Sequence, residues 1–191
     1  MFLWQDLTIK SKFNGEIKLK KFFGRYSVWV GGYEQSGPLV EKLWHKALKE
    51  VLLRNVLILG LGCGSILKPL LKKYPHSQIT GVEIDPVMIA LGKKYFNLDK
   101  IANLKIIIAD ATKTKLKDDF DLIIYDLYSG GELPKIIKFP FTSGQIILNY
   151  LRFGKSNEEK QRFQKKLENV FRIDNQLEAE YNTLFFLSPL R

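Results

Sequence analysis

After residue 55 the chain alternates between short apolar runs and segments in which apolar residues recur at helical spacing. Each of the first four runs ends at a glycine or at an acidic residue, where a strand would give way to a turn. Strands that alternate with helices are typical of a mostly parallel sheet with helices on both faces. We therefore expect an α/β, Rossmann-like domain whose first four strands are residues 56–59, 78–83, 104–109 and 120–125.

The apolar pattern continues beyond the fourth strand and adds three strands and one helix. Ser156 and Glu159 have the spacing of a capping box, which opens the helix. The added strands are residues 145–151, 172–177 and 183–187, the last two as a hairpin, so that the predicted sheet has seven strands. The helix is expected to bury the stripe Phe163, Leu167, Val170 and Phe171.

The first 37 residues show the alternation of a small antiparallel β unit, with strands at 7–10, 16–20 and 26–30. Three strands need a surface to pack on. The unit also carries more large aromatic side chains than a free surface would expose, so we expect it to pack on the main domain or on a second subunit. These residues are Trp4, Phe13, Phe22, Phe23 and Trp29.

Pro38 is expected to open a helix that leads into the first strand of the main domain. Its apolar residues at every fourth position would share one buried face. The predicted division is thus a β unit over residues 1–37 and a Rossmann-like domain over residues 38–191. The expected buried face comprises Leu39, Leu43, Ala47 and Val51.

The composition is that of an ordinary globular protein, with 191 residues, 46% hydrophobic and 26% charged. No apolar run approaches the roughly 18 residues of a membrane span, and the start lacks the layout of a secretory signal. We therefore expect a cytoplasmic location without membrane association. A single cysteine excludes an internal disulfide and leaves no cysteine cluster for zinc, and we predict no metal site.

The charge balance is strongly basic, with 30 Lys and Arg against 20 Asp and Glu, a net charge of +10. Such a balance attracts nucleic acids and other anionic partners. However, most of the lysines alternate with apolar residues, as they do on solvated faces. The charge therefore predicts at most a weak affinity for nucleic acid.

Three glycines at alternate positions, Gly60, Gly62 and Gly64, follow the first strand of the main domain. Glycine lets the backbone turn sharply and lets a ligand approach closely, and the free N–H groups at the start of a helix favour an anionic or polar group. A dehydrogenase fingerprint would need its third glycine where this chain has Ser65. The motif therefore favours an S-adenosyl cofactor over a nicotinamide one.

Acidic residues end the next three strands, namely Glu83, Asp110 and Asp126. Glu83 lies 23 residues after Gly60, where a carboxylate accepts both ribose hydroxyls of a bound nucleoside. Because the carboxyl ends of parallel strands meet at one edge, we expect these acids to surround a single ligand site at the switch in strand order.

These motifs resemble those of the class I S-adenosylmethionine-dependent methyltransferases, and among them of the spermidine synthase family. The likeness spans nearly the whole chain, from Gln35, Glu41 and the Trp44-His45 pair to Asp126. The resemblance implies the seven-stranded methyltransferase sheet. It also implies that Glu83 binds the ribose of the cofactor, that Asp110 and Ala111 bind its adenine, and that Gln35 contacts its thioether region. The cofactor-binding residues expected on this basis are Gln35, Gly60, Gly62, Cys63, Gly64, Glu83, Ile84, Asp110, Ala111 and Asp126.

The chain departs from the aminopropyltransferases of that family at the acids that hold amines. Cys63 stands where they have an aspartate in the glycine loop, Ser129 stands where they have the aspartate that activates putrescine, and Val40 replaces a third aspartate. One carboxylate–ammonium contact at ~4 Å is worth roughly 4 kcal/mol before desolvation, so these losses disfavour a diamine. A neutral Cys63 would also not repel the carboxylate of intact S-adenosylmethionine.

The sequence therefore predicts an S-adenosylmethionine-dependent methyltransferase with a small-molecule or macromolecular acceptor that remains unidentified. Asp126 would orient or deprotonate the acceptor, with Tyr128, Ser129 and His45 as candidate second groups. The alternatives are an aminopropyltransferase with a rearranged pocket that uses decarboxylated S-adenosylmethionine, and a non-catalytic module that binds nucleotide or RNA. A homodimer through the aromatic-rich β unit is a further expectation.

Overall fold

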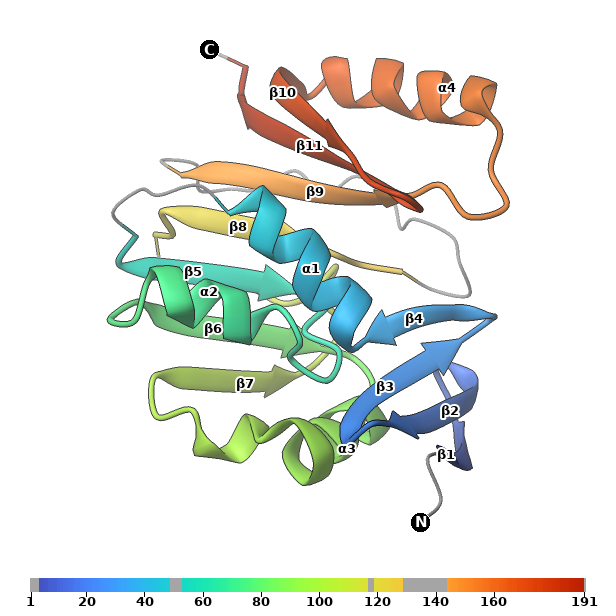
Figure 1. Cartoon of the computed structure of the whole chain (residues 1–191). Helices are drawn as coiled ribbons and strands as arrows, with labels where there is room; N and C mark the ends of the chain where they lie inside the picture. Colours follow the sequence, from blue (N-terminus) through green and yellow to red (C-terminus); the bar gives the residue numbers. More distant parts are fainter. Residues whose placement is uncertain (1–3, 49–52, 117–118, 129–143, 191) are drawn as a thin grey trace.

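The computed structural model describes residues 4–48, 53–116, 119–128 and 144–190, and it contains two sheets (Figure 1). The first is a four-stranded antiparallel sheet, in which each strand pairs with the next along the chain. The prediction of three strands was wrong by one, because the last strand has a polar sequence and pairs through its backbone. The strands are β1 (Trp4–Ser11), β2 (Gly15–Phe22), β3 (Arg25–Val30) and β4 (Tyr33–Ser36).

The second sheet has seven strands in the order β10-β11-β9-β8-β5-β6-β7, which confirms the predicted α/β, Rossmann-like fold. Strands β7, β6, β5, β8 and β9 are parallel, whereas β11 runs antiparallel to both of its neighbours. The order reverses at β5, since β6 and β7 lie on one side and β8 and β9 on the other. The bounds are β5 (Asn55–Leu59), β6 (Gln78–Glu83), β7 (Leu104–Ile108), β8 (Leu122–Tyr125), β9 (Gln145–Leu151), β10 (Phe171–Glu178) and β11 (Asn182–Pro189).

Hydrophobic clusters cover both faces of this sheet. In β5, Val56 and Ile58 join the cluster under the helices α1 (Pro38–Ala47) and α2 (Leu67–Lys73). Leu57 and Leu59 point the other way and join the cluster that includes Leu167 of α4 (Asn157–Glu168). The central strands are therefore apolar throughout because both of their faces are buried.

Two predicted helix faces need correction. Leu39 in α1 is 46% exposed, and the helix instead buries Leu43, Trp44 and Ala47, while Val51 lies outside the described residues. The capping box before α4 is present as predicted, but the helix ends at Glu168. Phe171 consequently belongs to β10, from which it still packs into the same cluster.

The N-terminal sheet docks on the helix α3 (Pro86–Phe96), which is followed by the short 3-10 helix η1 (Leu98–Lys100). Residues of β2 and β3 pack with Met88 and Leu91 of α3. Asp85 caps α3 by accepting a hydrogen bond from Val87 N (2.9 Å), and its second oxygen accepts bonds from Ser11 and from Asn14 Nδ2 (2.6 Å for the latter). These bonds tie the β1–β2 hairpin to the helix.

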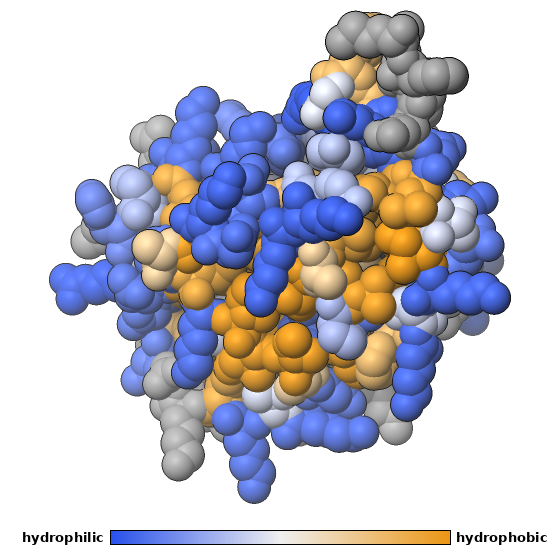
Figure 2. Space-filling model, turned by 90° about the horizontal axis from the view of Figure 1, so that it is seen from below, coloured by the Kyte–Doolittle hydropathy of each residue, from blue (hydrophilic) through white to orange (hydrophobic). Residues whose placement is uncertain are grey.

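Several N-terminal aromatic side chains are nevertheless exposed. Phe13, Phe22 and Phe23 are 42%, 46% and 69% exposed, so the β unit packs on the main domain through β2 and β3 and not through these three rings. Packing of the rings on a second subunit stays a prediction, and the side chain of Trp4 lies outside the description. Figure 2 shows the molecule from below, relative to the view of Figure 1. On this face, hydrophobic residues gather in the middle and hydrophilic residues surround them. The homodimer stays a prediction.

Among the described residues, no helix combines the length and the hydrophobicity that crossing a bilayer requires.

Candidate functional site

The glycine turn after β5 has the conformation that its sequence predicts. Gly60, Gly62 and Gly64 all have left-handed backbone angles, with φ of 86°, 56° and 84°. A Cβ atom added to Gly60 would lie 2.0 Å from the carbonyl oxygen of Asp126, far inside van der Waals contact. Glycine is therefore required for the end of β8 to pack against the turn.

Glu83 lies across from this turn, at the end of β6. Its Oε2 accepts a hydrogen bond from Gly62 N (2.8 Å) and its Oε1 accepts one from Asp85 N (2.9 Å). Burial raises the pKa of Glu83, although these backbone bonds oppose the rise. Each carboxyl oxygen keeps a second lone pair, so the fixed side chain is able to accept hydrogen bonds from two hydroxyl groups of a ligand.

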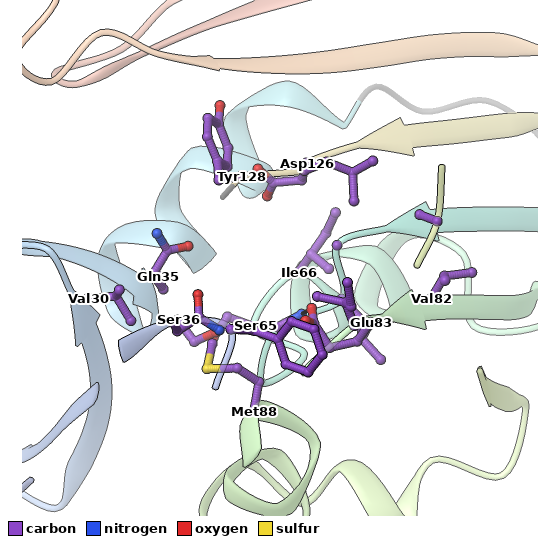
Figure 3. Close-up of a pocket in the computed structure, with 18 of the residues that line it drawn as sticks. Val30, Gln35, Ser36, Ser65, Ile66, Val82, Glu83, Met88, Asp126 and Tyr128 are labelled. Carbon is purple, nitrogen blue, oxygen red and sulfur yellow. Dashed lines mark hydrogen bonds between the residues drawn. The ribbon is translucent and has the colours of Figure 1, made fainter. Parts of the chain in front are cut away.

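A first cavity of about 290 Å³ opens above the glycine turn, between the carboxyl ends of the strands and the N-terminal sheet (Figure 3). Most of the predicted site residues line it, although they come from distant parts of the sequence. Cys63 and Gly64 do not line it, and Ser129 lies outside the described residues. The predicted residues that do line it are Gln35, Gly60, Gly62, Glu83, Ile84, Asp110, Ala111, Asp126 and Tyr128.

The side chain of Cys63 is fully buried in the cluster that contains Met88 and Leu91. Burial raises the pKa of its thiol to about 12, so the side chain is neutral. The structure therefore places Cys63 as a core residue, and only its backbone belongs to the glycine turn. This agrees with the expectation that Cys63 is neutral, whereas a role in cofactor binding stays a prediction.

Two serines line the first cavity and were not anticipated as site residues. Ser36 Oγ accepts a hydrogen bond from Cys63 N (3.1 Å), and Ser65 Oγ accepts one from Gly37 N (2.8 Å). Because Ser65 Oγ acts as an acceptor in this bond, its hydroxyl proton is left to donate to a ligand, whereas the Ser36 side chain also forms a hydrogen bond with the Cys63 side chain. Ser65 was visible in the sequence as the residue that interrupts a dehydrogenase fingerprint, whereas no pattern marked Ser36.

Trp44 also lines this cavity, and its indole N–H is buried without a hydrogen-bond partner among the described residues. Buried donors are rarely left unpaired in native proteins. The Ser65 hydroxyl and this indole give the wall of the cavity two neutral donors, which suit a polar or anionic part of a ligand.

Asp110 lies just after β7, where its backbone and side chain form a tight turn. Its Oδ1 accepts hydrogen bonds from Thr112 N (2.9 Å) and Thr112 Oγ1 (2.6 Å), and Lys113 forms an ion pair with Oδ2 (3.3 Å). The bonds from Thr112 lower the pKa of Asp110. The carboxylate is therefore ionised at neutral pH. It lies on the wall of the first cavity that is formed by the end of β7.

A second cavity of about 240 Å³ adjoins the first, and the two share part of their lining. Asp126 is one of the shared residues, and burial raises its pKa to about 7, helped by the charge of Glu83 and opposed by a hydrogen bond from Asn149. A carboxyl group between two cavities is thus able to exchange a proton near neutral pH. The shared residues are Tyr33, Gln35, Val40, Asp126 and Tyr128.

Side chains from two further strands support Asp126. Asn149 of β9 donates a hydrogen bond from Nδ2 to Asp126 Oδ1 (2.8 Å), and Asn182 of β11 donates one to Asn149 Oδ1 (2.9 Å). The hydroxyl of Tyr128 donates to the carbonyl oxygen of Asn149. Sequence analysis missed both asparagines, although Asn149 stood out as a polar residue inside an apolar strand.

The histidine considered as a second catalytic group does not reach either cavity. His45 is exposed on α1 and is absent from the lining of both. No group of three or more His, Cys, Asp or Glu side chains that could hold a metal ion occurs within the part of the chain that the structure describes.

Comparison with known proteins agrees with this geometry. Residues 56–135 match a family model described as a methyltransferase domain. The chain is 35% identical over 127 residues to polyamine aminopropyltransferase 2 of Aquifex aeolicus, which covers 59% of this chain and 26% of that protein. The chain therefore spans well under half the length of this curated relative.

Two solved structures are similar to the fold. Spermidine synthase of Thermotoga maritima superposes with a TM-score of 0.71 over 96% of this chain and 72% of its own, at 15% identity. Human methyltransferase-like protein 13, solved in complex with SAH, has a TM-score of 0.54 over 80% of both chains, at 21% identity. By its matched domain, this curated relative and these two folds, the chain is similar to class I S-adenosylmethionine-dependent methyltransferases and, among them, to the spermidine synthases.

Proposed function

We propose that this chain is a methyltransferase that binds S-adenosylmethionine in the first cavity and its acceptor in the second. The observation that carries the proposal is the placement of Asp126, which lines both cavities. When bound, the cofactor supplies a methyl group activated by a positively charged sulfur. The protein has to align the two reactants, which can contribute about 7–11 kcal/mol to lowering the barrier.

The residues of the first cavity fit such a cofactor. Glu83 would accept the ribose hydroxyls, since both of its oxygens are fixed by backbone N–H groups. Asp110 and Ala111 line the wall where the family resemblance expects the adenine.

The donor of Ser65 favours intact S-adenosylmethionine over its decarboxylated form, because a hydroxyl donor suits a carboxylate acceptor. The neutral thiol of Cys63 supports the same choice, since it adds no negative charge near the turn.

Asp126 is the candidate to take a proton from the acceptor. With a pKa of about 7, it is ionised in roughly half of the molecules at neutral pH, where a general base works best. Burial raises the pKa values of Tyr33 and Tyr128, so both phenols stay protonated. The hydroxyl of Tyr128 already donates to the Asn149 carbonyl oxygen, so Tyr33 is the phenol that is able to donate a hydrogen bond to the acceptor.

Aminopropyl transfer is the second candidate, and the lining of the second cavity favours it. Glu34, Asp126 and Glu180 line this cavity, whereas no Lys, Arg or His does so among the described residues. Tyr33 and Phe153 add an aromatic pair with ring centroids 5.7 Å apart. Carboxylates with aromatic rings suit an amine, and the curated relative is named as an aminopropyltransferase.

Calorimetry with S-adenosylmethionine and with its decarboxylated form separates the two candidates. We expect the intact cofactor to bind at least tenfold more tightly, and we expect Glu83→Gln to weaken its binding while Asp174→Asn, an exposed carboxylate on β10, does not. Transfer of labelled methyl groups to fractions of a cell extract would then identify the acceptor. Preferential binding of the decarboxylated form would establish the second candidate, and binding without transfer of either group would leave a non-catalytic module.

A further inference from the structure

A chain of side-chain hydrogen bonds leads from the last strand of the sheet to the wall between the two cavities. Asn182 Nδ2 donates to Asn149 Oδ1 (2.9 Å), and Asn149 Nδ2 donates to Asp126 Oδ1 (2.8 Å). The three residues come from β11, β9 and the end of β8, which are neighbours in the sheet. The chain thus connects Asp126 to a residue 56 positions later in the sequence.

The register of the sheet places the two asparagines on one face. Asn149 pairs with Leu184 and Leu151 pairs with Asn182, so the asparagines are diagonal neighbours on adjacent antiparallel strands. Asn149 is only 5% exposed and follows Ile147 on a face that is otherwise apolar. A buried amide on such a face is unfavourable unless both of its ends are hydrogen-bonded, and here both are.

We propose that Asn182 and Asn149 are positioning residues that hold one oxygen of Asp126 and present its ionised form to the acceptor. This inference rests on the proposed function for its catalytic meaning, but the hydrogen-bonded chain itself does not depend on it. Oδ2 of Asp126 has no hydrogen-bond partner among the described residues, which leaves it free for the acceptor.

The direction of the bonds determines which form of Asp126 is favoured. An asparagine that points its NH₂ group at a carboxyl group stabilises the carboxylate, whereas one that points its oxygen there stabilises the protonated acid. The donor of Asn182 occupies Asn149 Oδ1 and therefore keeps the NH₂ group turned toward Asp126. Without Asn182, the amide of Asn149 is free to turn over.

The other groups that face Asp126 act in the opposite direction or stay neutral. Glu83 on β6 disfavours a second negative charge. Tyr33 on β4 and Tyr128 beyond β8 keep their protons, since burial raises the pKa values of both. No Lys, Arg or His lines either cavity in the part of the chain that is described. Asn149 is thus the main group that favours the ionised form of Asp126, through the hydrogen bond that its amide donates.

The experiment is a titration of the Asp126 carboxyl carbon by NMR in the protein without cofactor, with Asp126→Asn identifying the resonance. We expect Asn149→Ala to raise the midpoint by about 1 pH unit or more, and Asn182→Ala to raise it by roughly half as much. Asn182→Gln, which keeps an amide donor, should recover part of the difference. Asn175→Ala is the matched control, because Asn175 is exposed on β10 and its side chain accepts a hydrogen bond from the adjacent Gln176 N.

A midpoint in Asn182→Ala equal to that of the wild type would overturn the proposal, as would an equal rise in Asn175→Ala. If Asn149→Ala does not fold, the midpoint of Asn182→Ala alone tests the proposal. This variant is expected to fold because the side chain that it removes is only half-buried. The titration needs neither cofactor nor acceptor, so failure of the proposed function, seen as absent cofactor binding, is distinguishable from failure of this inference. If methyl transfer is found, Asn182→Ala should move the rising limb of kcat to higher pH and leave the cofactor Kd unchanged.

Discussion

The two adjoining cavities are built in different ways. The first contains a glycine turn and a carboxylate held by backbone N–H groups, as in the bond from Gly62 to Glu83, although side chains of the N-terminal sheet and α1 also line it. The second is formed by side chains from both sheets and from α1, among them Trp29, Asn149 and Tyr181. A short motif is thus sufficient to encode the glycine turn of the first cavity, whereas the second has no such motif and exists only after distant strands have come together.

The difference between the two cavities also separates the features that depend on backbone geometry from the features that are particular to the side chains of this protein. Backbone geometry at a glycine turn tolerates little change, because any side chain would meet the neighbouring strand. Side chains that line an acceptor cavity vary without disturbing the fold. Under the proposed function, the first cavity therefore determines the choice of cofactor, and the second determines the choice of acceptor.

The largest expected effect comes from adding a methyl group to the turn. Gly60→Ala should lower the free energy of unfolding by about 4 kcal/mol, since backbone strain and the contact at 2.0 Å with the Asp126 carbonyl act together. Gly154→Ala is the matched control, because Gly154 also has a positive φ (72°) but has nothing within 4 Å, and we expect a loss of about 1 kcal/mol. Urea unfolding measures both, and equal losses would contradict a tightly packed turn.

Asp126 is where the two cavities meet, and its removal should affect turnover more than cofactor binding. Asp126→Asn should lower kcat by about 100-fold, the typical contribution of a general base, and change the cofactor Kd less than about threefold. Steady-state rates with the identified acceptor and calorimetry with the cofactor give the two numbers. A loss confined to cofactor affinity would assign Asp126 to the first cavity alone.

Glu83→Gln should weaken cofactor binding by about 30-fold. The amide loses the charge that strengthens bonds to hydroxyl groups, and it turns an NH₂ group toward one of the two backbone N–H donors, from Gly62 or Asp85. Calorimetry at fixed pH measures the change. Unaltered affinity would mean that the ribose does not bind at this carboxylate.

The smallest expected effect is on the pH dependence of stability. The pKa of Asp126 is about 7 in the folded state against an ordinary value of 3.8, so the folded state binds more protons between these pH values. Stability should therefore fall as pH rises from about 4 to about 7, and Asp126→Asn should remove this part of the dependence. Because the carboxyl group opens onto two cavities, we expect the variant to be only about 1 kcal/mol more stable than wild type at pH 8 and equal to it near pH 4. Urea midpoints at both pH values test this, and a variant that is less stable at pH 8 would contradict the raised pKa.

The sequence was informative where the chemistry is local. The glycine spacing, the acidic residue after each strand and the apolar runs predicted the seven strands and the residues around the first cavity. The sequence was misleading where one residue pattern is compatible with two different structures. Leu39 fitted a helical face that the structure turns toward solvent, and β4 forms without an apolar pattern because it pairs through its backbone.

By itself, then, the sequence determined the alternating α/β fold, the glycine turn and the carboxylate opposite it, because each depends on backbone conformation and on residues close along the chain. Only the tertiary structure decided that Cys63 is buried in the core, that Ser65 offers its hydroxyl to the first cavity, and that Asn182 reaches Asp126 through Asn149. These contacts join strands that are separated by tens of residues, and the register that brings them together follows from packing on both faces of the sheet. No local pattern encodes that register, since a shift by one residue would turn every side chain of a strand to the other face.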